Sequence, residues 1–110
     1  MLKKIKQPRV SVIIVNYNGK KFLPDLLNSL KKTKYLNYEI IIVDNASEDN
    51  SVKIVEKDYP KIKIIKNANT GFAGGLNTGI KVRSSDSEYI IPLNYDMYVH
   101  PDWLSHLIET

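Results

Sequence analysis

Polar and acidic residues follow each of four apolar runs in this sequence, and they are the residues best suited to chemistry. Asp44 and Asp96 stand out among them, because each comes at the end of an apolar run. A carboxylate near low dielectric is costly unless it meets a hydrogen-bond donor or a metal ion. Turn residues follow any strand, so a purely structural role is the alternative for each cluster. The four clusters are Asn16-Tyr17-Asn18, Asp44-Asn45, Asn67-Ala68-Asn69 and Asn94-Tyr95-Asp96.

The apolar runs before these clusters are predicted strands, and segments with helical periodicity separate them. Repeated strand–helix units predict an α/β fold, with a Rossmann-like, mostly parallel sheet and helices on both faces. In such a sheet ligands bind at the carboxyl ends of the strands, where all four clusters would lie. The predicted strands cover residues 10–15, 38–43, 62–66 and 88–93, and the predicted helices cover 21–32, a segment from Asp49 or Ser51 to Tyr59, 73–83 and a stretch that opens at Pro101.

Composition narrows the classes of function. The chain has 110 residues and no cysteine, and its 16 Lys and Arg against 12 Asp and Glu give a net charge of +4. We expect a single domain over residues 1–110, because no linker or internal repeat divides the chain. The lack of cysteine excludes disulfide frameworks and thiolate zinc sites. The mild positive charge argues against a nucleic-acid partner and suits a polyanionic small molecule or an anionic membrane surface.

Common nucleotide-binding motifs are absent. The turn after the first predicted strand, residues 16–19, lacks the glycines of the dinucleotide-binding pattern. The segment 74–79 differs from a P-loop, since Ile80 follows where that loop requires lysine. No apolar run is long enough to span a bilayer, so we expect a cytoplasmic protein, with peripheral membrane contact as a further expectation.

Four segments of the chain together resemble the first half of the family 2 glycosyltransferases, which are inverting enzymes with the GT-A nucleotide-diphospho-sugar fold. The resemblance runs from about Val10 to the end of the chain. It implies a truncated GT-A fold and the transfer of a sugar from a UDP- or dTDP-linked donor to a glycan, lipid or protein acceptor. The segments, in order, are VSVIIVNYNG, IIIVDNASEDNS, NANTGFAGGLNTGI and IIPLNYDMYVHPDW.

The resemblance assigns the recognition of the nucleobase to the first two segments. The backbone and ring around Val15, Asn16 and Tyr17 would line the base pocket. Asp44 would accept a hydrogen bond from the imide N–H of uracil or thymine, which is a suitable task for an ionised carboxylate. These four residues are therefore expected to gather at the carboxyl ends of the first two predicted strands.

The resemblance assigns contact with the rest of the nucleotide to the last two segments. Gly71 and Asn77 would approach the nucleotide across the start of a helix, and the glycines at 74, 75 and 79 would allow that helix to pack closely. Asn94 would lie beside the nucleotide. Asp96 would bind a divalent metal ion, Mn²⁺ or Mg²⁺, on the diphosphate, at the position of the D-x-D motif of this family.

The chain departs from the family pattern at two positions near the diphosphate. Asn94 replaces the first acid of the D-x-D motif, with Tyr95 in the middle, which is similar to the branch that includes rhamnosyl- and galactofuranosyl-type transferases. Leu76 stands where many members carry arginine, which would leave the phosphate charge mainly to the metal ion.

In this family the catalytic base lies in a second half of the protein, which residues 1–110 do not match. The catalytic residues are therefore unknown, and we expect residues 1–110 to be a donor-binding part without transfer activity. An inverting transferase needs a carboxylate to deprotonate the acceptor hydroxyl. A non-catalytic nucleotide-binding or interaction module of the same fold is the main alternative, and a sugar-1-phosphate nucleotidyltransferase is disfavoured because residues 16–21 lack its Gly-rich basic loop. Residues 88–93 are expected to form an unpaired sheet edge, through which copies could form a homo-oligomer.

Overall fold

Strands and helices alternate strictly along the chain. The structure is a computed structural model that describes residues 7–109. Every predicted element is present, and the bounds differ from the predicted ones by one or two residues. The elements are β1 (Arg9–Asn16), α1 (Leu23–Lys31), β2 (Tyr38–Asn45), α2 (Ser51–Asp58), β3 (Lys63–Asn67), α3 (Gly71–Lys81), β4 (Ser87–Asn94) and α4 (Trp103–Glu109).

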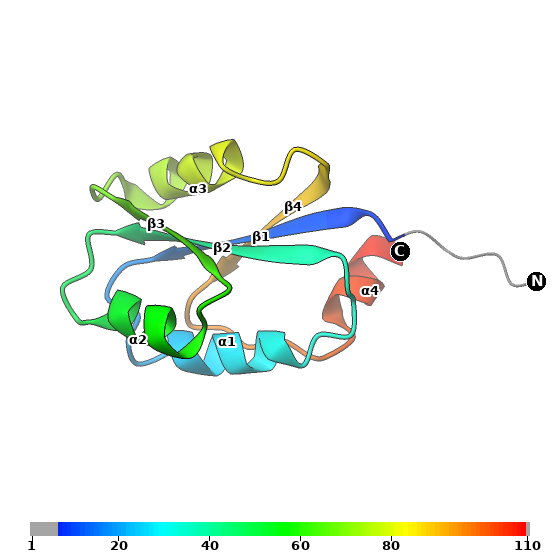
Figure 1. The fold of residues 1–110 in the computed structure, drawn as a ribbon, viewed down its shortest axis with the longest axis horizontal. Helices are drawn as coiled ribbons and strands as arrows, with labels where there is room; N and C mark the ends of the chain where they lie inside the picture. Colours follow the sequence, from blue (N-terminus) through cyan, green and yellow to red (C-terminus); the bar gives the residue numbers. More distant parts are fainter. Residues whose placement is uncertain (1–6, 110) are drawn as a thin grey trace, which may run out of the picture.

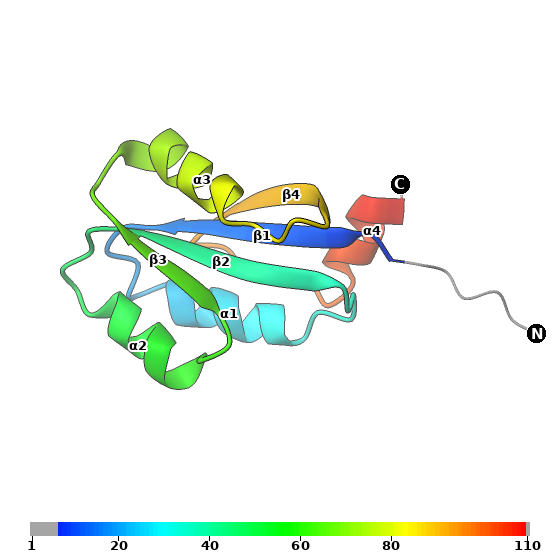
Figure 2. The same cartoon turned by 45° about the horizontal axis from the view of Figure 1, so that its top comes forward.

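The strands form one sheet in the order β3-β2-β1-β4, and every neighbouring pair is parallel. Helices α1 and α2 cover one face of this sheet and α3 covers the other (Figure 1). The view in Figure 2 shows the same three layers, with α4 at the end of the sheet where β1 begins. The predicted α/β fold with a parallel sheet and helices on both faces is therefore confirmed.

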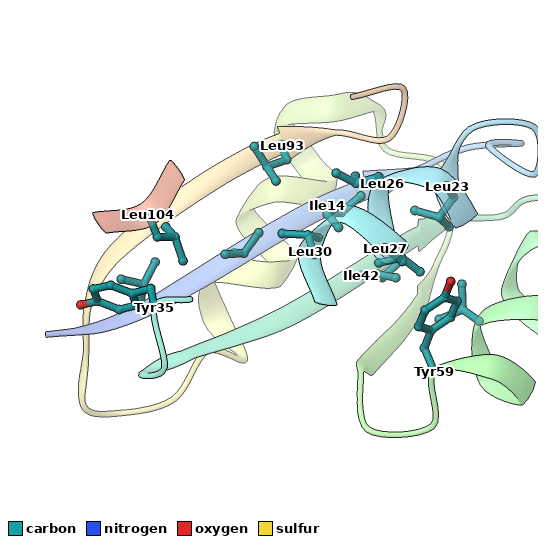
Figure 3. Packing of buried hydrophobic residues seen from close by; sticks show 13 residues of the cluster. Ile14, Leu23, Leu26, Leu27, Leu30, Tyr35, Ile42, Tyr59, Leu93 and Leu104 are labelled. Carbon is teal, nitrogen blue, oxygen red and sulfur yellow. The ribbon is translucent and has the colours of Figure 1, made fainter. Parts of the chain in front are cut away.

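The larger core lies between the sheet and α1. In a strand alternate side chains point to opposite faces, so Val10, Val12 and Ile14 of β1 all point to this side. Four leucines of α1 recur at helical spacing and are buried against them. Figure 3 shows this packing, with Leu104 of α4 closing one end of the cluster. The buried leucines of α1 are Leu23, Leu26, Leu27 and Leu30.

The smaller core lies between the sheet and α3, and glycines bring this helix close. A Cβ atom on Gly79 would lie 2.6 Å from Cγ2 of Ile13, and one on Gly75 would lie 2.7 Å from Cγ1 of Val15. Both distances are far below van der Waals contact, so neither glycine can gain a side chain without displacing the helix or the strand side chain beneath it. The close packing predicted for these two glycines is confirmed. Gly74 differs, because its Cβ would meet Thr70 of its own helix start.

The chain after β4 returns along α1 toward the start of the sheet. Ser29 of α1 accepts a hydrogen bond from the backbone N–H of Val99 at 3.0 Å, and Thr33 accepts one from the indole N–H of Trp103 at 3.0 Å. These bonds place α4 at the end opposite the polar clusters. None of the helices within residues 7–109 has the length and apolar character to cross a membrane.

Candidate functional site

The parallel register brings the predicted site residues to one edge of the sheet. Asn16 at the end of β1 lies level with Asp44 on β2, and Asp44 lies level with Lys66 on β3. On the other side of β1, Asn94 of β4 pairs with Val15. Parallel strands all end at the same edge, so four short sequence clusters far apart in the chain become neighbours.

Asp44 is a buried carboxylate with three hydrogen bonds. It is only 4% exposed. Its Oδ1 accepts bonds from the amide of Asn16 at 2.9 Å and from the hydroxyl of Ser47 at 2.6 Å. Its Oδ2 accepts the backbone N–H of Ser47 at 3.0 Å and no other bond from a described residue. A carboxylate oxygen has two acceptor positions, so Oδ2 has one position left for a ligand.

A pocket of about 300 Å³ adjoins Asp44, between the start of α2 and the end of β3. Lys53 and Lys66 give it two cationic side chains, and Lys66 lies 3.8 Å from the carboxylate of Glu56. Sequence reasoning missed both lysines. The signal for Lys66 was its place at the end of a predicted strand, level with Asp44. The pocket is lined by Asp44, Ala46, Ser47, Glu48, Asn50, Val52, Lys53, Lys66 and Asn67.

Hydrogen bonds tie the loop after β1 to the loop after β2. The backbone N–H of Asn18 donates to the hydroxyl of Ser47 at 2.8 Å, and the side chain of Asn18 accepts the N–H of Glu48 at 2.8 Å. The N–H of Lys20 donates to the carboxylate of Asp49 at 2.9 Å. Asn18 has a φ of 53°, a left-handed conformation that asparagine tolerates better than most residues. The two loops therefore form one hydrogen-bonded unit around Asp44.

Asp49 organises the start of α2. The sequence predicted a cap at Asp49 or Ser51, but Ser51 is the first helical residue and Asn50 precedes it with a φ of 67°. The carboxylate of Asp49 accepts the backbone N–H of Ser51 at 3.1 Å and its hydroxyl at 2.6 Å. Burial raises the pKa of Asp49, but the bonds from Ser51 and from the N–H of Lys20 outweigh it and hold the pKa below its ordinary value of 3.8.

The three predicted pocket residues at the end of β1 and directly after it point in different directions. Val15 is buried beneath Gly75 of α3, so its side chain supports that helix. The side chain of Asn16 is fully buried and its amide nitrogen donates to Asp44. Tyr17 is exposed at the start of the loop, where its ring is accessible to a ligand. The structure thus brings Asn16 together with Asp44.

Gly71 and Asn77 lie on α3, apart from each other. Gly71 begins the helix with a φ of 77°, which glycine adopts without strain, and its carbonyl accepts the amide N–H of Asn45 at 2.9 Å. Asn77 lies about 9 Å farther along the helix axis, at 1.5 Å per residue. It is exposed, on the side away from the buried Gly75 and Gly79. Only Gly71 therefore lies at the edge with Asp44.

The end of β4 is open. The side chains of Asn94 and Asp96 are exposed and have no hydrogen-bond partner among the described residues. Tyr95 between them turns inward, and its ring lies 6.3 Å from the ring of Phe22 at an angle of 43°. A Cβ atom on Gly19 would lie 2.8 Å from Cδ1 of Tyr95, so this ring packs directly on the first loop. Tyr95 thereby fixes the backbone that carries its two neighbours.

The donor set at Asp96 does not suit a metal ion held by protein alone. Within residues 7–109 no group of three or more acidic, histidine or cysteine side chains could hold one. Mn²⁺ and Mg²⁺ prefer oxygen ligands and are often held by one or two carboxylates together with phosphates. Asp96, with the amide oxygen of Asn94, fits a metal ion of that shared kind.

Comparison with known proteins gives the family. Residues 11–110 match the sequence model described as "Glycosyl transferase family 2". The chain belongs to this family. A curated relative, the undecaprenyl-phosphate 4-deoxy-4-formamido-L-arabinose transferase of Proteus mirabilis, is 36% identical over 93% of this chain. The poly(ribitol-phosphate) beta-N-acetylglucosaminyltransferase TarS of Staphylococcus aureus is 29% identical over 87% of it.

Solved structures of glycosyltransferases share the fold of this family 2 chain. A fragment of S. aureus TarS has a TM-score of 0.80 and 30% identity over 90% of this chain, and it has also been solved with UDP. The mannosyltransferase PcManGT of Pyrobaculum calidifontis, solved with GDP-Man and Mn²⁺, has a TM-score of 0.75 and 25% identity over 91% of this chain. These matches confirm the predicted GT-A fold. The chain spans 33% of the length of the arabinose transferase and 18% of the length of TarS.

Proposed function

We propose that this chain is the donor-binding part of an inverting glycosyltransferase. It binds a nucleotide-diphospho-sugar, linked to UDP or dTDP, whose sugar is transferred to a glycan, lipid or protein acceptor. The observation that carries the proposal is the carboxylate of Asp44, which is buried, held by three hydrogen bonds and left with one acceptor position beside a pocket.

The chemistry of that carboxylate suits a uracil or thymine base. The imide N3–H of these bases is a donor that Oδ2 of Asp44 can accept, whereas N3 of cytosine has no hydrogen. Tyr17 offers an exposed ring near the base, and Gly71 lets backbone approach the nucleotide at the start of α3. Asn77 lies on the exposed side of α3, so it would contact the donor only if part of the donor extends over that side of the helix.

Asp96 would hold a divalent metal ion on the diphosphate, together with Asn94. Such an ion would neutralise the phosphate charge and stabilise the leaving nucleoside diphosphate. The exposure of both side chains supports this assignment, because they can reach a ligand without breaking other bonds. The Mn²⁺ recorded with the mannosyltransferase of P. calidifontis supports the type of ion.

The type of donor is a finer part of the proposal, and it rests on one residue. Asn94 stands where the family motif has an acid, which favours a donor of the rhamnosyl- or galactofuranosyl-type branch. We propose that residues 1–110 by themselves bind this donor without transferring its sugar, since transfer needs a carboxylate base and none of the described carboxylates is assigned that role. A cytoplasmic location is part of the same proposal. So is peripheral contact with an anionic membrane surface, which the net charge of +4 supports.

The edge of β4 would be the surface through which copies associate. This strand pairs with β1 on one side and ends the sheet on the other, and Tyr89 and Ile90 on it are exposed. Unpaired edges with apolar side chains favour association with another strand. Light scattering of the purified chain should therefore show association that grows with concentration, and a monomer at every concentration would refute it.

Calorimetry with four ligand conditions tests the proposed site. UDP and CDP are titrated into the parent chain with Mn²⁺ and with a chelator, and again into Asp44→Asn and Asp96→Asn. The parent should prefer UDP by about tenfold or more, since a hydrogen bond to a charged group contributes about 1.5–3 kcal/mol. Asp44→Asn should remove the preference for UDP and keep the effect of Mn²⁺ on affinity. Asp96→Asn should keep the preference for UDP and remove the effect of Mn²⁺.

Three results would contradict the proposal. Equal affinity of the parent for UDP and CDP would remove the role of Asp44 in reading the base. An effect of Mn²⁺ that persists in Asp96→Asn would place the metal ion elsewhere. Absence of binding to any nucleoside diphosphate would favour the non-catalytic interaction module.

A further inference from the structure

We propose that Asn16 is a positioning residue that holds the carboxylate of Asp44 in the orientation needed to read the base. This inference rests on the proposed function. The side chain of Asn16 is 0% exposed, so it cannot contact a nucleotide itself. Any effect of this side chain on nucleotide binding must therefore pass through the residues that it contacts.

The amide nitrogen of Asn16 lies among three oxygen atoms. It is 2.9 Å from Oδ1 of Asp44, 2.9 Å from the hydroxyl of Ser51 and 3.2 Å from the hydroxyl of Ser47. A carboxylate can only accept hydrogen bonds, which fixes the amide with its NH₂ group toward Asp44. The amide has two hydrogens for three acceptors, so this nitrogen has no donor left for any other partner.

The opposite end of the amide is confined by packing. Oδ1 of Asn16 is buried and has no hydrogen-bond partner among the described residues. A Cβ atom on Gly19 would overlap this oxygen and would lie 2.8 Å from the ring of Tyr95. The amide is therefore held from one side by hydrogen bonds and from the other by the first loop.

Asn16 differs from Ser47 in what it connects to Asp44. Ser47 lies three residues after Asp44, in the loop that follows β2, so its two bonds to the carboxylate move with that loop. Asn16 ends β1, which pairs with strands on both sides. Among the described residues, the bond from Asn16 is therefore the one hydrogen bond that links the carboxylate of Asp44 to β1, a central strand of the sheet. It leaves Oδ2, the oxygen with a vacant acceptor position, directed to the ligand.

A matched pair of variants tests this role. Threonine and valine have the same shape and both favour strands, but only threonine has a hydroxyl, which is a donor one bond shorter in reach than the amide of asparagine. The measurement is the ratio of UDP affinity to CDP affinity for Asn16→Val and Asn16→Thr. We expect the parent ratio to fall by about tenfold in Asn16→Val, as for the loss of one charge-assisted bond, and to fall less in Asn16→Thr.

Ser51→Ala is the matched control. Ser51 is nearly as buried as Asn16 and accepts a bond from the same amide, but it makes no hydrogen bond to Asp44. It should keep the parent ratio. If its ratio falls as far as that of Asn16→Val, general loosening of the network explains the effect and the inference is wrong.

The outcomes separate this inference from the proposed function. If Asp44→Asn loses the preference for UDP and Asn16→Val keeps it, the inference fails and the proposed function stands. If the parent shows no preference, both fail. If Asn16→Val binds neither nucleotide, Asn16→Ala, which also lacks a donor, takes its place. A fallen ratio in Asn16→Ala supports the inference, and a parent-like ratio together with weaker folding assigns Asn16 to stability alone.

Discussion

Two regions at the same edge of the sheet are built in opposite ways. Around Asp44, two loops are joined by hydrogen bonds between side chains and backbone, and the carboxylate is nearly inaccessible. At the end of β4, Asn94 and Asp96 are exposed and have no hydrogen-bond partner among residues 7–109. Only Tyr95 is anchored there, by its packing against Phe22 and Gly19.

The difference indicates how binding energy would be used in each region. Around Asp44 the polar groups are ordered before a ligand arrives. Binding there costs little conformational entropy and discriminates well between ligands. At the end of β4, a ligand and a metal ion would have to order the two side chains themselves. Metal ion and nucleotide should therefore strengthen each other's binding by the same factor.

The largest expected effect is a difference in the free energy of unfolding that is lost when an aspartate is removed from each region. Asp44→Ala should lower the free energy of unfolding by about 2–3 kcal/mol, because it removes a carboxylate that accepts three hydrogen bonds and leaves the N–H of Ser47 without its acceptor. Asp96→Ala should change it by less than about 0.5 kcal/mol, as is usual for an exposed side chain. Urea unfolding of both variants measures the difference, and equal losses would mean that the end of β4 is ordered as well.

Gly19 lies where the two regions meet and should give the next largest effect. A methyl group there would collide with Asn16 and with the ring of Tyr95, and such overpacking destabilises by about 1–3 kcal/mol. We expect Gly19→Ala to lower the urea midpoint accordingly. Gly74→Ala serves as a comparison for the cost of a clash away from the two regions, since its methyl group would lie 2.4 Å from the hydroxyl of Thr70 and 2.6 Å from its Cβ. A neutral Gly19→Ala would show that Tyr95 can move freely and that the two regions are independent.

Asp49 should give the smallest of these effects on stability, with a distinct pH dependence. Its pKa is lower in the folded chain than the ordinary 3.8, so its contribution is fully present above pH 3.8 and is lost as the pH falls through the folded-state pKa. Asp49→Ala should lose about 1 kcal/mol at pH 7, because it removes the acceptor of the bonds from Ser51 and Lys20, as when a helix start loses its capping side chain. Urea unfolding of both proteins from pH 7 to pH 3 should show this gap closing below pH 3.8, and a gap that stays constant would contradict the assignment.

The sequence by itself predicted the elements and the edge where the site lies. Apolar β-branched runs such as residues 10–15 form strands wherever they can be buried, and the leucines of α1 carry helical spacing. Both signals are local, so no tertiary information was needed. Once the strands are parallel, the position of Asp44 at their carboxyl edge follows from its place in the chain. The bounds of α3 shifted by two residues because its glycines carry little local signal.

The tertiary structure decided what each polar residue does at that edge. Asn16 and Tyr17 are neighbours in the sequence, yet one is buried in a network from three segments and the other is exposed. Asn77 faces away from the sheet because Gly75 and Gly79 face toward it. Lys66 joins the pocket only through its register with Asp44. Burial and hydrogen bonding depend on residues distant in the chain, which no local pattern of residue types records, so these roles became visible only when the strands were placed side by side.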